Sequence, residues 1–306
     1  HHYFAEPAKI SGIVYRIIPE DLTAVAEFEL GNLDMIVIPA SAYKRFRDNP
    51  QWRDRIVERR GLNTYYLGLN CARQPFHDVR MRRAVFQAID REKILRTFYE
   101  GRGRLVAGPI ADVLRSWRPT AAYPFDPDAA KNFVRMTGNE GTTVSLYVTT
   151  DQEMIDIAEI IQDSLQNIGL HVSIKQLEWS AYKEAINRGE ADLFWLSWWA
   201  DYPDAENFLF PLFHSANYGY RGNRTRYRNP DVDRFITMGQ RAVREKDRTL
   251  AYSRAEQLIV NDLPWVFFWH KNDYFVVQPR LHGIRPWPIH SMDKGTDMYL
   301  KEAGAP

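Results

Sequence analysis

The clearest pattern of apolar and polar positions lies in the middle of the chain. A short apolar run at 144–148 is typical of a strand. Apolar residues at helical spacing follow over 154–168, behind a capping-box signature at Thr150–Glu153. Residues 170–177 then alternate between apolar and polar types, as in a half-buried strand. This strand–helix–strand order predicts a parallel or mixed sheet flanked by helices.

The first forty residues show the same order on a smaller scale. Residues 12–19 are rich in β-branched types, residues 22–30 are compatible with a helix, and residues 34–39 form a short apolar run. Together they predict a βαβ unit, in which a crossover joins two parallel strands. Because so small a unit cannot bury both faces of its strands alone, we expect its sheet to be completed elsewhere.

Several further segments carry a strand or helix pattern. Strands are predicted at 64–70, 193–199, 265–270 and 274–278, and helices at 78–89, 91–98, 181–187, 231–243 and 248–261. A loop is predicted between the strand at 193–199 and the helix at 231–243. The arginine-rich face near 78–89 favours a solvated helix face over a phosphate site.

Composition narrows the classes of function. The 306 residues carry 40 Lys and Arg against 39 Asp and Glu, so the long-range attraction that dominates nucleic-acid binding is missing and no nucleic acid partner is expected. The single cysteine, Cys71, excludes an intrachain disulfide and any multi-cysteine metal site. No stretch approaches the roughly 20 consecutive apolar residues of a membrane span. His1 and His2 are left out of the argument, since tag and native residues look alike in a sequence.

Aromatic residues are the unusual part of the composition. They make up 13% of the chain, and seven of the nine tryptophans lie between Trp179 and Trp287. The predicted strand at 193–199 ends in this region, just before Asp201. Ligands of open α/β sheets bind beyond the carboxyl ends of strands, so one interpretation is an aromatic pocket in which Asp201 anchors a cation. The other is that the rings are core and that Asp201 or Asp204 caps the turn.

The usual catalytic and cofactor motifs are absent. The sequence has no P-loop, no His-Glu-x-x-His pair and no Gly-x-Ser-x-Gly elbow. The acidic cluster of Asp201, Asp204 and Glu206 lacks the spacing of a calcium loop. These absences do not exclude an enzyme, but they remove the simple sequence arguments for one. Our expectation is no catalytic residue, no metal and no cofactor. A glycosidase that uses two of these carboxylates is kept as a remote alternative.

A resemblance to a known family rests on an ordered series of motifs that spans nearly the whole chain. The motifs are Ile13–Pro19, Gly31–Asp34, Tyr65–Asn70, Pro75–Arg80, Ala84–Glu92, Trp198–Asp204, Asn223–Pro230 with Asp233, and Ala255–Pro264. On these residues the sequence resembles the family 5 extracellular solute-binding proteins, the peptide and nickel receptors of ABC importers.

The resemblance implies a fold and a division into lobes. It implies the α/β fold of the type II periplasmic binding proteins, with a mixed sheet flanked by helices. Residues 1–64 correspond to part of the first lobe, whose N-terminal portion is expected to be absent. Residues 65–269 correspond to the complete second lobe, and residues 270–306 to the return into the first. The chain is thus expected to be a C-terminal fragment of a two-lobed receptor.

The junction of the lobes is expected to act as a hinge. The chain is expected to cross it near 62–66 and near 268–272, and closure on a ligand would bend these segments. Trp265, Trp269 and Trp287 have no assigned ligand chemistry, and we expect them to be packing residues near this junction.

The resemblance also implies a ligand site. In peptide-binding relatives the motif aspartate receives the peptide ammonium, and the motif tryptophan lines the pocket. The expected ligand-binding residues are Asp201 as the ammonium anchor, Trp198 as a pocket wall, Trp199 and Tyr202 close by, and Asn223 and Tyr227 on the adjoining segment. The family's carboxylate-binding arginine has no matching motif here, and Arg221, Arg224 and Arg226 are expected at the surface.

The implied function is that of the substrate-binding component of an ABC importer, which captures oligopeptides or dipeptides. Its expected partners are this ligand and an ABC permease in the membrane. The receptor is expected to be a monomer in the periplasm or outside the cell, either free or lipid-anchored. A nickel chelate or an oligosaccharide is the alternative ligand, since aromatic clefts also bind sugars by stacking.

Overall fold

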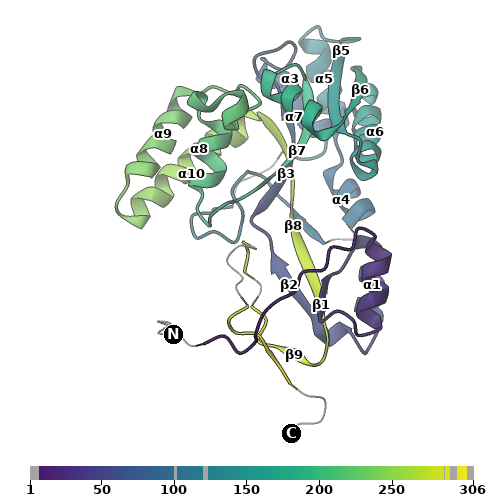
Figure 1. Ribbon diagram of the computed structural model, residues 1–306. Helices are drawn as coiled ribbons and strands as arrows, with labels where there is room; N and C mark the ends of the chain where they lie inside the picture. The colour runs from purple at the N-terminus through teal and green to yellow at the C-terminus, as the bar shows by residue number, and fades with distance from the viewer. Residues whose placement is uncertain (1–6, 100–101, 120–122, 286, 290–294, 302–306) are drawn as a thin grey trace. The chain divides into compact units, whose positions relative to one another are not determined.

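The computed structural model describes residues 7–99, 102–119, 123–285, 287–289 and 295–301, and its elements are shown in Figure 1. His1, His2 and Gly101 lie outside the described residues. The chain divides into two compact units: unit 1 comprises residues 1–61 and 272–306, and unit 2 comprises residues 62–271. These boundaries differ from the expected limits of the lobes by three residues (61 against 64) and by two residues (271 against 269).

Unit 2 is built on a mixed sheet. Three strands are parallel: β5 (Thr143–Thr149) lies between β6 (His171–Leu177) and β7 (Leu193–Trp199). β7 pairs antiparallel with β3 (Asn63–Leu69), which in turn pairs antiparallel with the first half of β8 (Trp265–Val277). The predicted mixed sheet is therefore confirmed.

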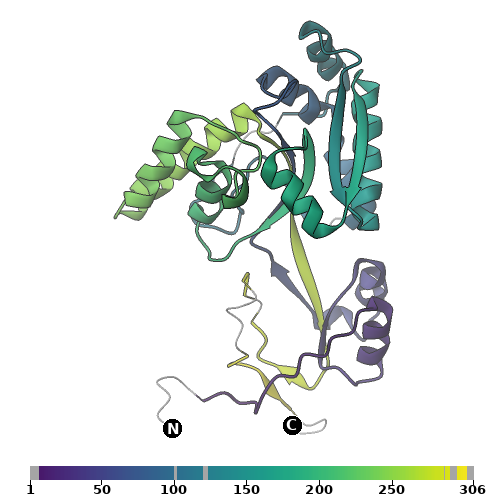
Figure 2. The same ribbon diagram turned by 45° about the horizontal axis from the view of Figure 1, so that its top comes forward.

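Two crossover helices connect the parallel strands. α6 (Gln152–Asn167) joins β5 to β6, and α7 (Trp179–Arg188) joins β6 to β7. Because β6 and β7 lie on opposite sides of β5, two right-handed crossovers place the helices on opposite faces of the sheet. Figure 2 shows α6 and α7 on different sides of β5 and β6. The sides that face one another are apolar and buried, as at Leu146, Ile157 and Ile161.

Two further groups of helices belong to unit 2. The first comprises α3 (Val79–Ala88), α4 (Arg91–Tyr99) and α5 (Pro127–Met136). The second, drawn in green in Figure 1, comprises α8 (Glu206–Phe213), α9 (Pro230–Arg241) and α10 (Glu245–Asp262), which pack on one another. The short elements are β4 (Gly103–Leu105), which pairs with β8, and the 3-10 turns η2 (Ser215–Asn217) and η3 (Gly219–Arg221). In the described part of the chain, no helix has the length and apolarity to span a membrane.

Unit 1 is smaller and has its own core. Its elements are α1 (Asp21–Glu29), β1 (Met35–Val37), α2 (Ala40–Asp48), the 3-10 turn η1 (Arg53–Arg55), β2 (Ile56–Arg60), the second half of β8, β9 (Leu281–His282) and β10 (Tyr299–Leu300). β1 and β2 both pair antiparallel with β8, and β9 pairs with β10. The buried rings of Phe28, Phe46 and Trp52 pack together in the core of this unit.

Several predictions about these elements are wrong. Residues 12–19, all within the described part of the chain, form no strand, and β1 is antiparallel to its partner, so the expected βαβ unit is not formed. Residues 265–270 and 274–278 belong to one strand, β8, because the polar residues between them are paired with β2 and β4. α8 lies where the pattern predicts a loop, since its nearly continuous apolar run contains Pro211 and shows no helical spacing.

Two local predictions about side chains also need correction. The N-cap of α6 is Asp151, whose carboxylate accepts the backbone N–H of Met154 at 3.1 Å, and not Thr150. Trp265 and Trp269 are buried packing residues as expected, but Trp287 is 41% exposed. Trp287 lies in an irregular segment between β9 and β10.

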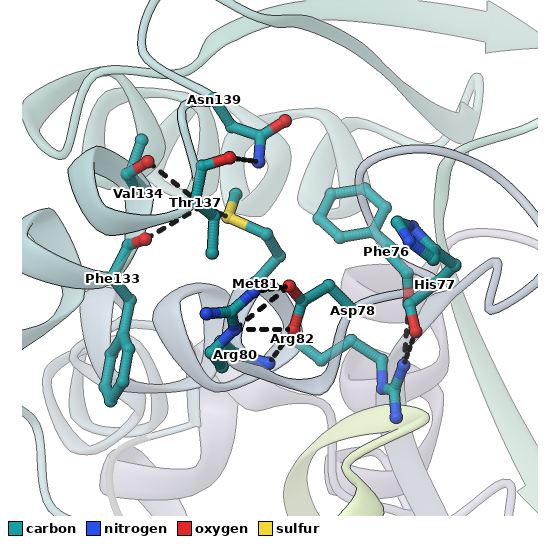
Figure 3. A network of polar contacts seen from close by, with 10 residues as sticks. All are labelled: Phe76, His77, Asp78, Arg80, Met81, Arg82, Phe133, Val134, Thr137 and Asn139. Atoms are coloured by element: carbon teal, nitrogen blue, oxygen red, sulfur yellow. Dashed lines mark hydrogen bonds and ion pairs between the residues drawn. The ribbon is translucent and has the colours of Figure 1, made fainter.

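The arginine-rich helix α3 is only partly a solvated face. Arg80 is exposed and pairs with Asp78, the N-cap residue of the helix, at 2.6 Å. Arg82 is buried, and it donates hydrogen bonds of 2.6–3.0 Å to the backbone carbonyls of Phe76, His77 and Asp262. Figure 3 shows its guanidinium turned toward the carbonyl of His77 ahead of α3. Arg82 thus ties the start of α3 to the end of α10.

Candidate functional site

A pocket of about 630 Å³ opens in unit 2 beyond the carboxyl ends of the parallel strands β5 and β7. Its walls come from the last residues of these strands, the first turns of α6 and α7, and the start of β3. The residues that line it are Tyr65, Thr149, Asp151, Glu153, Met154, Trp179, Lys183, Trp195, Leu196, Ser197, Trp198, Trp199, Asp201 and Arg224. Crevices at this place are where open α/β sheets bind ligands.

Tryptophan rings supply much of the pocket wall. Trp198 and Trp199 end β7, and Trp179 begins α7. Trp179 and Trp199 are 52% and 45% exposed, so their rings are free to meet a ligand. Trp195 is buried and packs on Trp269 with ring centres 5.7 Å apart, so it belongs to the core as well as to the pocket. Trp195 is thus a core residue, as one interpretation of the aromatic cluster has it, and ligand binding by the exposed rings stays a prediction.

The two aspartates that follow β7 have different surroundings. Asp204 accepts the backbone N–H of Glu206 at 2.8 Å and pairs with Arg248 at 2.8 Å, so it caps the turn before α8. Asp201 lines the pocket and is exposed. Among the described residues, its carboxylate has no hydrogen-bond donor and no ion pair. Its acceptor oxygens are thus open to a cation from outside.

A buried amide holds this turn in place. Oδ1 of Asn207, in the first turn of α8, accepts the indole N–H of Trp198 at 3.2 Å and the backbone N–H of Asp201 at 3.1 Å. The side chain of Asn207 is almost fully buried, at 4% exposure. The expected anchor and the expected wall are therefore linked through one residue that the sequence motifs did not single out.

The pocket also carries two cations. The ammonium of Lys183 on α7 lies 5.2 Å from the centre of the Trp179 ring. The guanidinium of Arg224 is buried and donates to the side chain of Asn187 at 2.9 Å and to the carbonyl of Gly222 at 3.3 Å. Within the described part of the chain, neither cation pairs with an acid. Burial lowers the pKa of Lys183, and the positive charge of Arg224 lowers it further.

The two other acids of the pocket are already engaged. Asp151 caps α6, and Glu153 accepts the hydroxyl of Tyr99 at 2.5 Å. Burial and the negative charge of Glu153 raise the pKa of Tyr99, which keeps its hydroxyl protonated as a donor. Over the residues that the structure describes, no group of three or more His, Cys, Asp and Glu is placed to hold a metal ion.

Three of the expected ligand-binding residues do not line the pocket. Tyr202 is exposed beside it and donates its hydroxyl to Glu206. Asn223 is fully buried and donates to the backbone carbonyl of Tyr227 at 2.9 Å, and Tyr227 in turn donates its hydroxyl to Asp262. Asn223 and Tyr227 thus brace the segment between η3 and α9, and a role for them in ligand binding stays a prediction.

The motifs did not single out the two lining cations, Lys183 and Arg224, or the buried Asn207 that bonds to the turn of Asp201. The expectation that Arg224 lies at the surface is wrong, because its segment folds back against α7 and buries the guanidinium. Lys183 lies one helical turn after Trp179, and both residues belong to α7. Because the predicted helix began only at residue 181, the sequence did not show that these two side chains share one helix face. No local pattern places Arg224 or Asn207, since both depend on how distant segments pack.

Comparison with known families decides what kind of protein carries this pocket. The model of the bacterial extracellular solute-binding proteins, family 5 Middle, matches residues 1–220. The chain belongs to this family. Family 5 solute-binding proteins are binding receptors and not enzymes, so the glycosidase alternative is set aside.

This family 5 chain is similar to receptors that are named for different ligands. It is 26% identical over 296 residues to "Heme-binding protein A" of Haemophilus influenzae, covering 94% of this chain and 54% of that protein. It is also 26% identical over 312 residues to "Oligopeptide-binding protein AppA" of Bacillus subtilis, covering 94% and 55%. The chain thus spans about half the length of the curated relatives that it matches.

Solved structures confirm the periplasmic-binding-protein fold of this family 5 chain. HbpA2 from Haemophilus parasuis matches with a TM-score of 0.84 at 25% identity, covering 96% of this chain and 59% of that one. DppA from Helicobacter pylori, in complex with the peptide STSA, matches with a TM-score of 0.84 at 23% identity, covering 98% and 59%.

Proposed function

We propose that this chain carries the ligand-binding pocket of the substrate-binding component of an ABC importer, and that the ligand is a short peptide. The observation that carries the proposal is the unpaired carboxylate of Asp201 beside an aromatic pocket at the strand ends. Every peptide with a free N-terminus presents one α-ammonium whatever its sequence, and flat aromatic walls accept side chains of varied shape. One anchor with such walls suits a receptor of broad specificity.

The charges of the pocket favour a zwitterionic ligand. Asp201 offers a negative charge, and Lys183 and Arg224 offer positive charges that pair with no acid among the described residues. A short peptide with free termini carries a charge of each sign. A neutral oligosaccharide carries no charge that could pair with any of these three groups. Removing water from them when such a sugar binds would cost free energy, and no ion pair would offset this cost. This comparison supports the peptide over the sugar.

The exposure of Asp201 sets the expected strength of binding. A charge-assisted contact to a desolvated ammonium is worth roughly 1.5–3 kcal/mol, whereas an exposed ion pair is worth about 0–1 kcal/mol. Because Asp201 is exposed, we expect this chain to bind peptides weakly. Closure that desolvates Asp201 would strengthen the contact, and the two chain crossings at Gly61–Leu62 and Lys271–Asn272 are the proposed hinge.

We also propose that unit 1 is part of a larger first lobe. Its segment 12–18, which forms no strand, exposes the large side chains of Ile13, Val14 and Ile17, and Ile17 is 94% exposed. Exposed apolar side chains of this kind offer a surface that further polypeptide can cover. Strands from further polypeptide would cover the segment, as expected for a two-lobed receptor that works with a membrane permease in the periplasm or outside the cell.

The test is calorimetric titration with trialanine and with N-acetyl-trialanine, which lacks the ammonium. We expect the wild type to prefer trialanine by up to about fivefold, the value of an exposed ion pair. Asp201→Asn should remove this preference, because the neutral amide offers no charge. Asp128→Asn changes an exposed aspartate on α5 outside the pocket and should leave the preference intact.

Two results would contradict the peptide proposal. One is equal affinity of the wild type for the two peptides, and the other is an unchanged preference in Asp201→Asn. Since one relative is named for heme, hemin is titrated in parallel and followed by its absorbance. Saturable binding of hemin without binding of either peptide would replace the peptide by heme as the ligand.

A further inference from the structure

Asn207 is a buried polar side chain that hydrogen-bonds to both the expected anchor and the expected wall of the pocket. It lies at the start of α8, directly after the turn that carries Asp201, and it is 4% exposed. Its Oδ1 accepts two hydrogen bonds, from the indole N–H of Trp198 at 3.2 Å and from the backbone N–H of Asp201 at 3.1 Å. A carbonyl oxygen has two lone pairs, so both acceptor positions are used.

The backbone of Asn207 also contacts the turn. Its N–H donates to the carbonyl of Asp204 at 3.1 Å, which joins the first turn of α8 to the end of the turn that carries Asp201. Asn207 therefore contacts this turn at its beginning and at its end.

Other bonds hold the two ends of the turn. The backbone N–H of Ala200 donates to the carbonyl of Leu62, the N–H of Asp204 donates to the carbonyl of Tyr202, and the Asp204 carboxylate pairs with Arg248. Among the described residues, none of these bonds involves Asp201 or the indole of Trp198. Without Oδ1 of Asn207, the backbone N–H of Asp201 and the indole N–H of Trp198 would both lose their acceptor. The backbone of the turn and the side chain of Trp198 could then adopt other torsion angles.

We propose that Asn207 is a positioning residue for the ligand site, which sets the direction of the Asp201 carboxylate relative to the Trp198 ring. The inference rests on the proposed function only in naming the ligand group, an ammonium; the coupling of Trp198 to Asp201 through Asn207 is a property of the free protein. Holding the Asp201 carboxylate in its binding direction before the ligand arrives raises affinity, because the turn loses less conformational entropy on binding.

Two variants test the role of the side chain oxygen. Asn207→Leu keeps the size of the side chain and removes both hydrogen bonds, whereas Asn207→Asp keeps an oxygen that can accept them. Asn217→Leu is the matched control, because Asn217 is also buried at 7% exposure and its amide donates to the carbonyl of Phe210 at 2.7 Å, away from the pocket. If Asn207→Leu does not fold, Asn207→Ser, which is too short to bridge both donors, takes its place.

The first measurement needs no ligand. In nitrogen–proton spectra of the folded chain, the indole resonance of Trp198 is assigned with Trp198→Phe, and its exchange with solvent is timed. We expect exchange to become roughly tenfold faster in Asn207→Leu, the factor for a lost hydrogen bond of ordinary strength. Asn207→Asp and Asn217→Leu should keep the exchange rate of the wild type within about twofold.

The second measurement is the preference for trialanine over N-acetyl-trialanine. Asn207→Leu should reduce it to about one, as Asp201→Asn does, while Asn207→Asp restores most of it and Asn217→Leu leaves it unchanged. A purely structural role of Asn207 would lower thermal stability in both leucine variants and leave the preference in place.

The outcomes separate the two proposals. Slow indole exchange and an intact preference in Asn207→Leu would overturn the positioning role while the peptide receptor stands. If the wild type shows no preference between the peptides, the peptide proposal fails, and the indole exchange still decides whether Asn207 holds the turn.

Discussion

Glu256 is a buried acid whose ionisation should make the stability of unit 2 fall as pH rises from 4.5 to about 8. It lies on α10 at 2% exposure, and its Oε1 accepts a single hydrogen bond, from the backbone N–H of Ile110 at 3.1 Å. The carboxyl group fits against Gly108, where an added Cβ would lie 2.6 Å from the same oxygen. Burial raises the pKa of Glu256 from 4.5 to about 8, and the bond from Ile110 offsets only part of this rise.

The sign and size of the effect follow from the shifted pKa. Because the pKa is higher in the folded state, the folded protein holds this proton at pH values where the unfolded chain has lost it. The free energy of unfolding therefore falls as pH rises from 4.5 to about 8, and the stabilisation is complete only below 4.5. At about 1.4 kcal/mol per pH unit, the whole window amounts to roughly 5 kcal/mol.

Glu256→Gln isolates this contribution, since glutamine keeps the shape and the acceptor oxygen and cannot ionise. The assay is urea unfolding followed by tryptophan fluorescence between pH 6.5 and 9. The lower limit avoids the titration of His270, whose pKa is lowered by burial from 6.5 to about 4. Between pH 6.5 and 8 the wild type should lose about 2 kcal/mol more than Glu256→Gln.

The control for this experiment is Glu190→Gln, which changes an exposed glutamate of the same unit and should keep the pH dependence of the wild type. The reasoning is refuted if the wild type and Glu256→Gln show the same slope of unfolding free energy against pH over this range. Equal slopes would mean that Glu256 is already ionised in the folded state at pH 6.5.

The remaining predictions concern other buried groups. His270→Gln should reduce the loss of unfolding free energy that the wild type shows as pH falls from 6.5 to 4, because the buried imidazole takes up no proton in the folded state until about pH 4. The same loss in wild type and variant, measured by urea unfolding over this pH range, would count against this. Arg82→Met should cost roughly 3 kcal/mol in urea unfolding, since three backbone carbonyls lose their donor, and a cost below about 1 kcal/mol would mean that water replaces it. Gly68→Ala places a Cβ 2.3 Å from the Phe194 ring and should cost about 1–3 kcal/mol in thermal unfolding, whereas Gly12→Ala, with nothing within 4 Å, should be neutral; equal effects would refute the overpacking.

The elements that could be predicted are those with a complete local signal. α6 shows apolar residues at helical spacing, and the run 144–148 and the alternation at 170–177 sit on either side of it as β5 and β6. α7 ends at Gly189, whose φ of 75° is the left-handed conformation that glycine adopts without strain. In each of these cases the spacing of apolar residues and the flanking residues point to the same element, so local and tertiary preferences agree.

Other elements failed because their identity depends on a partner far away in the chain. Residues 12–19 have the composition of a strand, but no strand pairs with them within the described residues, so they form no strand. β8 is one strand across its polar middle because β2 and β4 pair with those residues. Backbone pairing of this kind joins residues more than 160 positions apart, which no local window of sequence contains.

The α/β order of the segments at 144–177 and the closeness of Trp198 and Asp201 at the end of one strand follow from the sequence, because local patterns carry them. The family follows from it too, because its motifs occur in order along the chain. Which charges remain unpaired depends on the tertiary structure. Asp204 finds Arg248, 44 residues further on, and so becomes a cap, while Asp201 has no such partner in the described chain. Arg224 is buried in the pocket wall because its segment packs on α7. The charge that the pocket offers to a ligand depends on which ionised side chains find no partner in the folded chain. Pairing is set by the distances between residues that are remote in sequence, and these distances exist only in the folded structure.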